Sequence, residues 1–148
     1  MANEAHVAIL AHGVDAWNSW RAQHQDVRPD LRNANLAGAG LDDAQFTRAN
    51  LEGADLTGAH LRGANLQFAY LKGATLNGAR LRGINLQGAC LISADLRGAD
   101  LRKANLSGAD LREALLAGAN LVGADLRRAD LKGANLTNVD LTDTLRDT

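Results

Sequence analysis

The chain has 148 residues, a formal net charge of −1 and 46% hydrophobic residues, which is typical of one globular domain and excludes a disordered or strongly basic chain. Aromatic residues make up only 3% of the sequence and proline occurs once, whereas glycine occurs 15 times. A core must therefore be built from many small aliphatic side chains rather than from a few large rings.

Residues 3–25 have the pattern of one amphipathic helix. Asn3 is suited to cap its amino end, and apolar side chains recur at helical spacing along one face. The helix must end before Pro29, which cannot continue it. We therefore expect a helical domain over residues 1–28. Its packing face consists of Val7, Leu10, Val14 and Trp17, with Trp20 alongside.

The amino end also bears on the compartment. The apolar run from Val7 to Ala11 is too short for a signal peptide or a membrane span, and no Lys or Arg precedes it. The single cysteine, Cys90, cannot form an internal disulfide. The sequence thus predicts a cytoplasmic protein without membrane association.

A five-residue repeat follows. From residue 31 to residue 141 there are 23 positions at steps of five, and every one is Leu except one Phe. Two residues before them lie 22 positions, of which 20 are Ala. Steps of five would spread side chains around a helix, whereas in an extended chain each Ala and its Leu point to the same side. The two columns therefore predict the core, which includes Phe46, Leu56, Leu61, Leu66 and Leu86.

Side chains of an extended chain alternate between its two sides, so a repeat of five, an odd number, leaves one residue in each unit that must turn the chain. This is the residue two after each Leu. It is Gly in 13 of 23 units, and Gly tolerates positive φ at a corner. A chain that turns the same way after every short strand winds into a coil whose turns stack as parallel strands. The sequence therefore predicts an all-β solenoid, and spacing alone leaves three or four sides per coil open.

Units such as ADLTG, ANLSG and ADLRR resemble the A(D/N)LxX signature of the pentapeptide repeat proteins over residues 30–143. AWNSWR resembles the cap segment that precedes the coils in some bacterial members. The resemblance implies a right-handed quadrilateral parallel β-helix over residues 29–143, with 20 residues per coil and nearly six coils. The helical domain then caps the first coil, and residues 144–148 form a short tail. Because no amphipathic helix follows the last coil, we expect this tail or a second copy of the chain to cover it.

Residues 20 apart share an outward column if the coils stack. The position before Leu is Asp or Asn in 15 of 23 units, which favours local hydrogen bonds to the backbone over catalysis. Asp110 and Asp130 share a column with basic neighbours, which favours structural pairing over paired-carboxylate chemistry. No Cys–His pair, metal-ligand spacing or phosphate-cradling motif is formed. We expect no catalytic residue, no metal and no cofactor, and hence a protein that is not an enzyme.

Two surface features are candidates for partner binding. One is a column of basic side chains, in which like charges repel unless an anionic partner or the nearby Asp42 and Asp100 neutralise them. The column consists of Arg62, Arg82 and Arg102, and His60 and Arg80 lie beside the first two. The other is a small apolar patch, which is either a protein contact or a chance cluster of exposed side chains. It consists of Phe68, Tyr70, Cys90 and Ile92.

The sequence favours a rigid scaffold that binds another protein, whose identity it does not reveal. One alternative is binding of an anionic polymer such as nucleic acid by the Arg62, Arg82 and Arg102 face, although that face has no stacking aromatics. The resemblance adds another alternative, because some members mimic DNA and bind DNA gyrase, conferring quinolone resistance. Those members rely on a strongly acidic surface and a helical carboxyl-terminal dimer contact, and this chain has neither.

Overall fold

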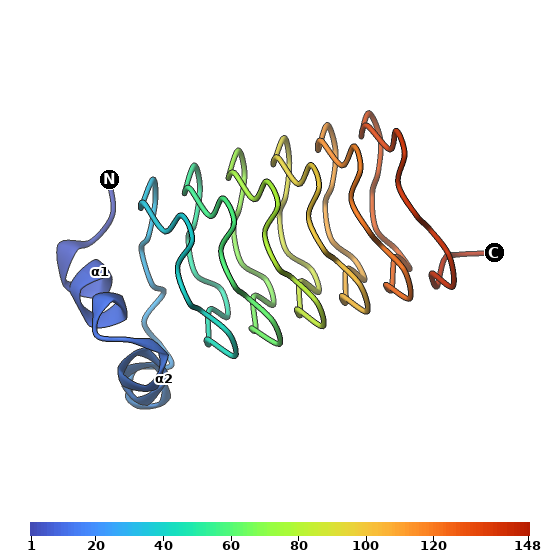
Figure 1. Ribbon diagram of the computed structural model, residues 1–148. Helices are drawn as coiled ribbons and strands as arrows, with labels where there is room; N and C mark the ends of the chain where they lie inside the picture. Colours follow the sequence, from blue (N-terminus) through green and yellow to red (C-terminus); the bar gives the residue numbers. More distant parts are fainter.

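The computed structural model describes residues 1–148 and is a rod of stacked coils with two helices at one end (Figure 1). Every β-bridge is parallel and joins residues 20 positions apart, from Asp30 and Asn50 at one end to Asp125 and Leu145 at the other. A residue with positive φ stands at every fifth position from 33 to 143. The coil therefore has 20 residues and four corners, and the 23 corners make nearly six coils.

The strands are shorter than the repeat pattern suggests. Each is a single bridged residue just before a Leu, because the two residues after that Leu already belong to a turn. The next Ala closes the turn, as where the N–H of Ala54 donates to the carbonyl of Leu51 at 3.0 Å. Positive φ at the third turn residue is typical of a type II turn. Ten corners hold residues other than glycine, so the repeat itself imposes this geometry.

The Leu and Ala columns form one continuous core inside the coils. Burial is almost complete in the middle of the rod and decreases toward its far end, where Leu131, Leu136 and Leu141 are half-buried. The residues expected in the core that are at most 1% exposed are Phe46, Leu56, Leu61, Leu66 and Leu86.

The amino-terminal segment forms two helices, α1 (Glu4–Ala11) and α2 (Val14–Gln23), and the prediction of one helix is wrong. Gly13 separates them with a φ of +104°, which a residue inside an α-helix cannot adopt. Asn3 does cap α1, because its Oδ1 accepts hydrogen bonds from the N–H groups of Ala5 and His6 at 2.9 and 3.3 Å. Neither helix has the length and apolar character needed to cross a bilayer.

The far end of the rod carries no helix (Figure 1). Leu145 continues the hydrogen-bonded ladder there: its N–H donates to the carbonyl of Ala124 and its carbonyl accepts from the N–H of Leu126. Its side chain is 50% exposed, because it occupies the outward position before a Leu site rather than the Leu site itself. This end therefore presents an exposed leucine beside the half-buried core of the last coil.

Candidate interaction surfaces

The outward Asp and Asn side chains hold the turns. At all 15 Asp or Asn positions before a Leu, the side-chain Oδ1 accepts a hydrogen bond of 3.0–3.3 Å from the N–H of the residue after that Leu. Backbone N–H groups need such a partner when the ladder supplies none. The interpretation of this column as local side chain to backbone bonding is confirmed.

In five strands the carboxylate also binds an arginine two residues later. Both oxygens accept hydrogen bonds of 2.7–3.0 Å from Nε and Nη2. These bonds are the main reason why the pKa of each of the five Asp carboxyls is lowered. The pairs are Asp30–Arg32, Asp95–Arg97, Asp100–Arg102, Asp110–Arg112 and Asp125–Arg127.

Asp110 and Asp130 do lie in adjacent coils. Arg112 binds Asp110 at 2.7 Å and places its Nε 3.9 Å from Asp130. The structural pairing predicted for these two carboxylates is confirmed. No group of three or more His, Cys, Asp or Glu side chains is arranged to hold a metal ion.

The basic column, together with Arg80 beside it, divides into a paired and an unpaired part. Arg102 is bound by Asp100, with Nε–Oδ1 and Nη2–Oδ2 distances of 2.8 and 2.7 Å. Arg62, Arg80 and Arg82 are exposed and make no ion pair. Asp100 therefore neutralises mainly Arg102, the last arginine of the column. Arg82 also lowers the pKa of Asp100, but less than Arg102 does.

Two neighbours complete the unpaired part. His60 bridges Arg80 in the next coil. Asp42 uses its Oδ1 to accept a hydrogen bond of 2.8 Å from the backbone N–H of Arg62, which leaves the guanidinium without an ion pair. We refer to His60, Arg62, Arg80 and Arg82 as the cationic cluster.

The apolar patch is assembled but partly covered. Tyr70 and Cys90 are bridged neighbours, and the Phe68 and Tyr70 side chains are 50% and 43% exposed. The guanidinium of Arg28 lies 3.8 Å from the centroid of the Tyr70 ring, a cation–π contact that the sequence analysis missed. Ile92 and Cys90 are half-buried. The freely exposed apolar surface is therefore smaller than the sequence suggests.

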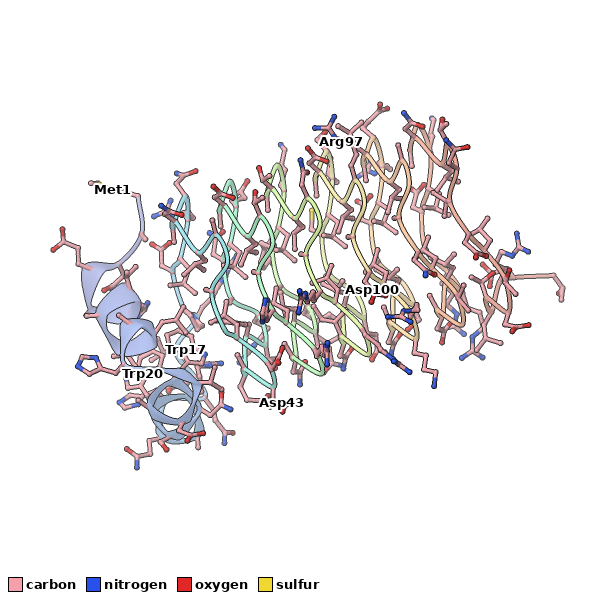
Figure 2. All side chains as sticks on the ribbon, viewed as in Figure 1. Met1, Trp17, Trp20, Asp43, Arg97 and Asp100 are labelled. Atoms are coloured by element: carbon pink, nitrogen blue, oxygen red, sulfur yellow. The ribbon has the colours of Figure 1, made fainter.

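The cap tryptophans lie where the helices meet the first coil (Figure 2). Trp17 is completely buried, its ring centroid is 5.5 Å from that of Phe46, and its Nε1–H donates to a backbone carbonyl of the first coil at 2.8 Å. Trp20 packs between His6 and His24, with both ring centroids at 5.0 Å. Leu10 is 6% exposed and Val14 is half-buried against the core. These contacts are those of a packed cap.

Arg21 is a buried residue that the sequence analysis did not single out. Its side chain, in the last turn of α2, is only 7% exposed. An arginine beside the WxxW pattern is normally assigned to the solvent side of a helix, so only its packing against the first coil could identify it.

The chain is similar to known proteins that are built from pentapeptide repeats. The family model for pentapeptide repeats matches residues 30–63, 64–102 and 104–143 with eight copies. No curated protein sequence is significantly similar to the chain. Among solved structures, the pentapeptide repeat protein Rfr23 from the cyanobacterium Cyanothece 51142 is 30% identical, with 88% of this chain and 94% of that chain covered and a TM-score of 0.54.

Two further structures are more distant in shape. A pentapeptide repeat protein from the Arabidopsis thaliana thylakoid lumen is 38% identical, with 74% of this chain and 69% of that chain covered and a TM-score of 0.37. QnrB1, a plasmid-mediated fluoroquinolone resistance protein, is 20% identical, with 84% and 69% covered and a TM-score of 0.37. The family match spans most of the chain and agrees with its 20-residue coils. This chain therefore belongs to the pentapeptide repeat family.

Proposed function

We propose that the protein is a non-enzymatic scaffold that presents rigid faces of its β-helix to another protein, and that the cationic cluster docks an acidic patch of that partner. The observation that carries the proposal is a contrast in charge pairing. Five outward carboxylates are bound by arginines, whereas Arg62, Arg80 and Arg82 make no ion pair. Like charges in neighbouring coils repel, and acidic groups of a partner remove that repulsion.

The rigidity of the coils supports a scaffold role. The N–H of Leu61 donates to the carbonyl of Arg80 in the next coil at 2.8 Å, and the N–H of His60 donates to Ala39 in the previous coil at 2.9 Å. This pattern recurs along the rod. A surface that is fixed before binding loses little conformational entropy when the partner docks. We take the winding as right-handed, from the family resemblance, and the location as cytoplasmic, from the sequence.

Binding of an anionic polymer by the same cluster is the second candidate. Three exposed arginines in two coils favour contacts to phosphates. The pairing of Arg102 with Asp100 weakens this candidate, and so does the position of the exposed Phe68 and Tyr70 rings in other columns. DNA mimicry directed at gyrase is not proposed, because the formal net charge is only −1 and five of the outward carboxylates are bound by arginines.

We also propose a homodimer through the last coil. The half-buried Leu131, Leu136 and Leu141 and the exposed Leu145 leave core side chains uncovered at this end, and a second copy related by a two-fold axis would cover them. Sedimentation should show a dimer for the wild type and a monomer for Leu145→Lys. A wild-type protein that stays monomeric at all concentrations contradicts this contact.

Affinity capture from native lysate tests the scaffold proposal. The wild type is compared, with and without nuclease, with an Arg62→Glu/Arg80→Glu/Arg82→Glu variant and with a charge-matched control. The control carries Lys72→Glu, Lys132→Glu and Arg146→Glu. We expect one defined protein that resists nuclease, is retained by the control and is lost from the cluster variant. Material that nuclease removes from the wild type would instead support the anionic-polymer candidate.

A further inference from the structure

A polar pocket lies between the end of α2 and the first coil. Its volume is about 370 Å³, and it is open to solvent. None of the residues around it is acidic, and two are arginines. The pocket is lined by Asn18, Arg21, Ala22, Gln25, Gln45, Thr47 and Arg48. Nothing in the repeat pattern requires a pocket here, because it is formed by the cap and the coil together.

Arg21 is the buried charge of this pocket. Its Nη1 donates to the carbonyls of His24 and Val27 at 2.9 and 2.7 Å, and its Nη2 donates to the carbonyl of Thr47 at 3.3 Å. Its Nε is buried and has no hydrogen-bond partner. No carboxylate pairs with it, and burial followed by repulsion from Arg48 lowers its pKa. A buried cation without a counter-ion is unfavourable.

Arg48 brings a second positive charge to the same place. It occupies the corner after Phe46, is exposed, and donates from Nη2 to the carbonyl of Gln25 at 3.0 Å. The side chains of Gln45 and Thr47 make no hydrogen bond. The pocket therefore combines two guanidinium groups with unused amide and hydroxyl donors and offers no negative charge in return.

We propose that this pocket binds a small oxyanion with at least two anionic oxygens, either a phosphate or a di- or tricarboxylate. Guanidinium forks match both groups, because two oxygens can accept parallel hydrogen bonds. The anion supplies the counter-charge that Arg21 lacks and ties α2 to the first coil. The site is distinct from the cationic cluster, so it does not depend on the proposed function.

Thermal unfolding and calorimetric titration test the site, with sodium phosphate and sodium citrate as probes and NaCl at matched ionic strength as the salt control. We expect the wild-type Tm to rise with phosphate or citrate beyond the NaCl response, because a ligand that binds only the folded state stabilises it. Arg48→Gln should bind about tenfold more weakly or worse, since it loses a charged hydrogen-bond donor. Arg146→Gln removes the same charge far from the pocket and should bind as the wild type does.

A second variant separates binding from a purely structural role of the arginines. Gln45→Glu adds a carboxylate within the pocket, so its Tm without added anion should exceed that of the wild type, and its response to both probes should disappear. A response to phosphate alone assigns the site to phosphates, and a response to citrate alone assigns it to carboxylates. An anion response that is absent from the wild type, or equal in the wild type and Arg48→Gln, overturns the proposal.

Discussion

Arg102 is bound at two points by Asp100 within one strand, whereas Arg82, at the same position one coil earlier, follows Arg80 instead of an acid and makes no ion pair. The backbone of the two coils is the same, and a single residue of the repeat unit decides which arginine is neutralised. The charge pattern of each face can therefore change coil by coil while the fold stays constant.

Arg80→Asp should convert the unpaired arrangement into the paired one. The new carboxylate stands two residues before Arg82, as Asp100 stands before Arg102. We expect the free energy of unfolding to rise by about 1 kcal/mol, because the variant gains a turn hydrogen bond and loses a like-charge contact. Urea unfolding measures the change. Arg80→Asn also loses the like-charge contact and gains the turn hydrogen bond, but it cannot form the ion pair with Arg82 and should be intermediate; an Arg80→Asp variant less stable than the wild type contradicts this prediction.

Truncation of core leucines should show where the rod is closed and where it is open. Leu86 is 1% exposed, whereas Leu136 is half-buried in the last coil. Leu86→Ala should lower the free energy of unfolding by about 2–5 kcal/mol, and Leu136→Ala by roughly half of that or less. Chemical denaturation compares them under one condition. Equal losses would mean that the last coil is covered in solution, as in the proposed dimer, and diluting the protein should then restore the difference.

Gly88→Ala should be more destabilising than Gly58→Ala. Both glycines have a φ of +64°, but only at Gly88 would a Cβ approach a ring, lying 2.5 Å from Phe68. The positive φ costs roughly 1–2 kcal/mol at either site, and the clash adds to it only at Gly88. Thermal unfolding should show that Phe68→Ala removes the extra loss. If both glycine variants lose the same stability, Phe68 does not pack over that corner in solution.

The five Asp–Arg pairs predict how stability depends on pH. Because the pKa of each of these Asp carboxyls is lowered in the folded state, the pairs stabilise the fold above the unfolded pKa of about 3.9 and cease to do so as the pH falls through the folded pKa. The contribution of these pairs to Tm should therefore be level between about pH 7 and 5 and fall below about pH 4. The arginines are exposed, so salt should weaken the effect. A Tm that does not fall in acid contradicts it.

The solenoid could be predicted from sequence because its 23 core positions repeat without a slip, so one unit explains all of them. The break at Gly13 was missed because a single glycine inside a helical pattern is compatible with either one helix or two. Asp–Leu–Arg spacing could have identified the Asp100–Arg102 pair, since both side chains point outward from one strand.

The remaining site features depend on the cap. Arg28 lies in the connection after α2, and no local pattern places it over Tyr70, 42 positions later in the chain. Arg21 is buried where α2 meets the first coil, and it donates a hydrogen bond to the carbonyl of Thr47 in that coil. The geometry of the coils can be predicted because the same unit recurs along the sequence. The contacts between the cap and the first coil depend on how two different structures pack, and no recurring sequence pattern specifies them.

Photocrosslinking in native lysate tests directly whether a partner protein docks on the cationic cluster. A photoreactive side chain replaces either Lys103 or Lys132. Lys103 is exposed at the corner one coil beyond Gly83 and so lies beside Arg82, whereas Lys132 is exposed in another column and serves as the control. We expect a nuclease-resistant protein adduct from position 103 that is weak or absent at position 132 and disappears in the Arg62→Glu/Arg80→Glu/Arg82→Glu background. Adducts only with nucleic acid, or equal protein adducts from both positions, would contradict docking through the cationic cluster.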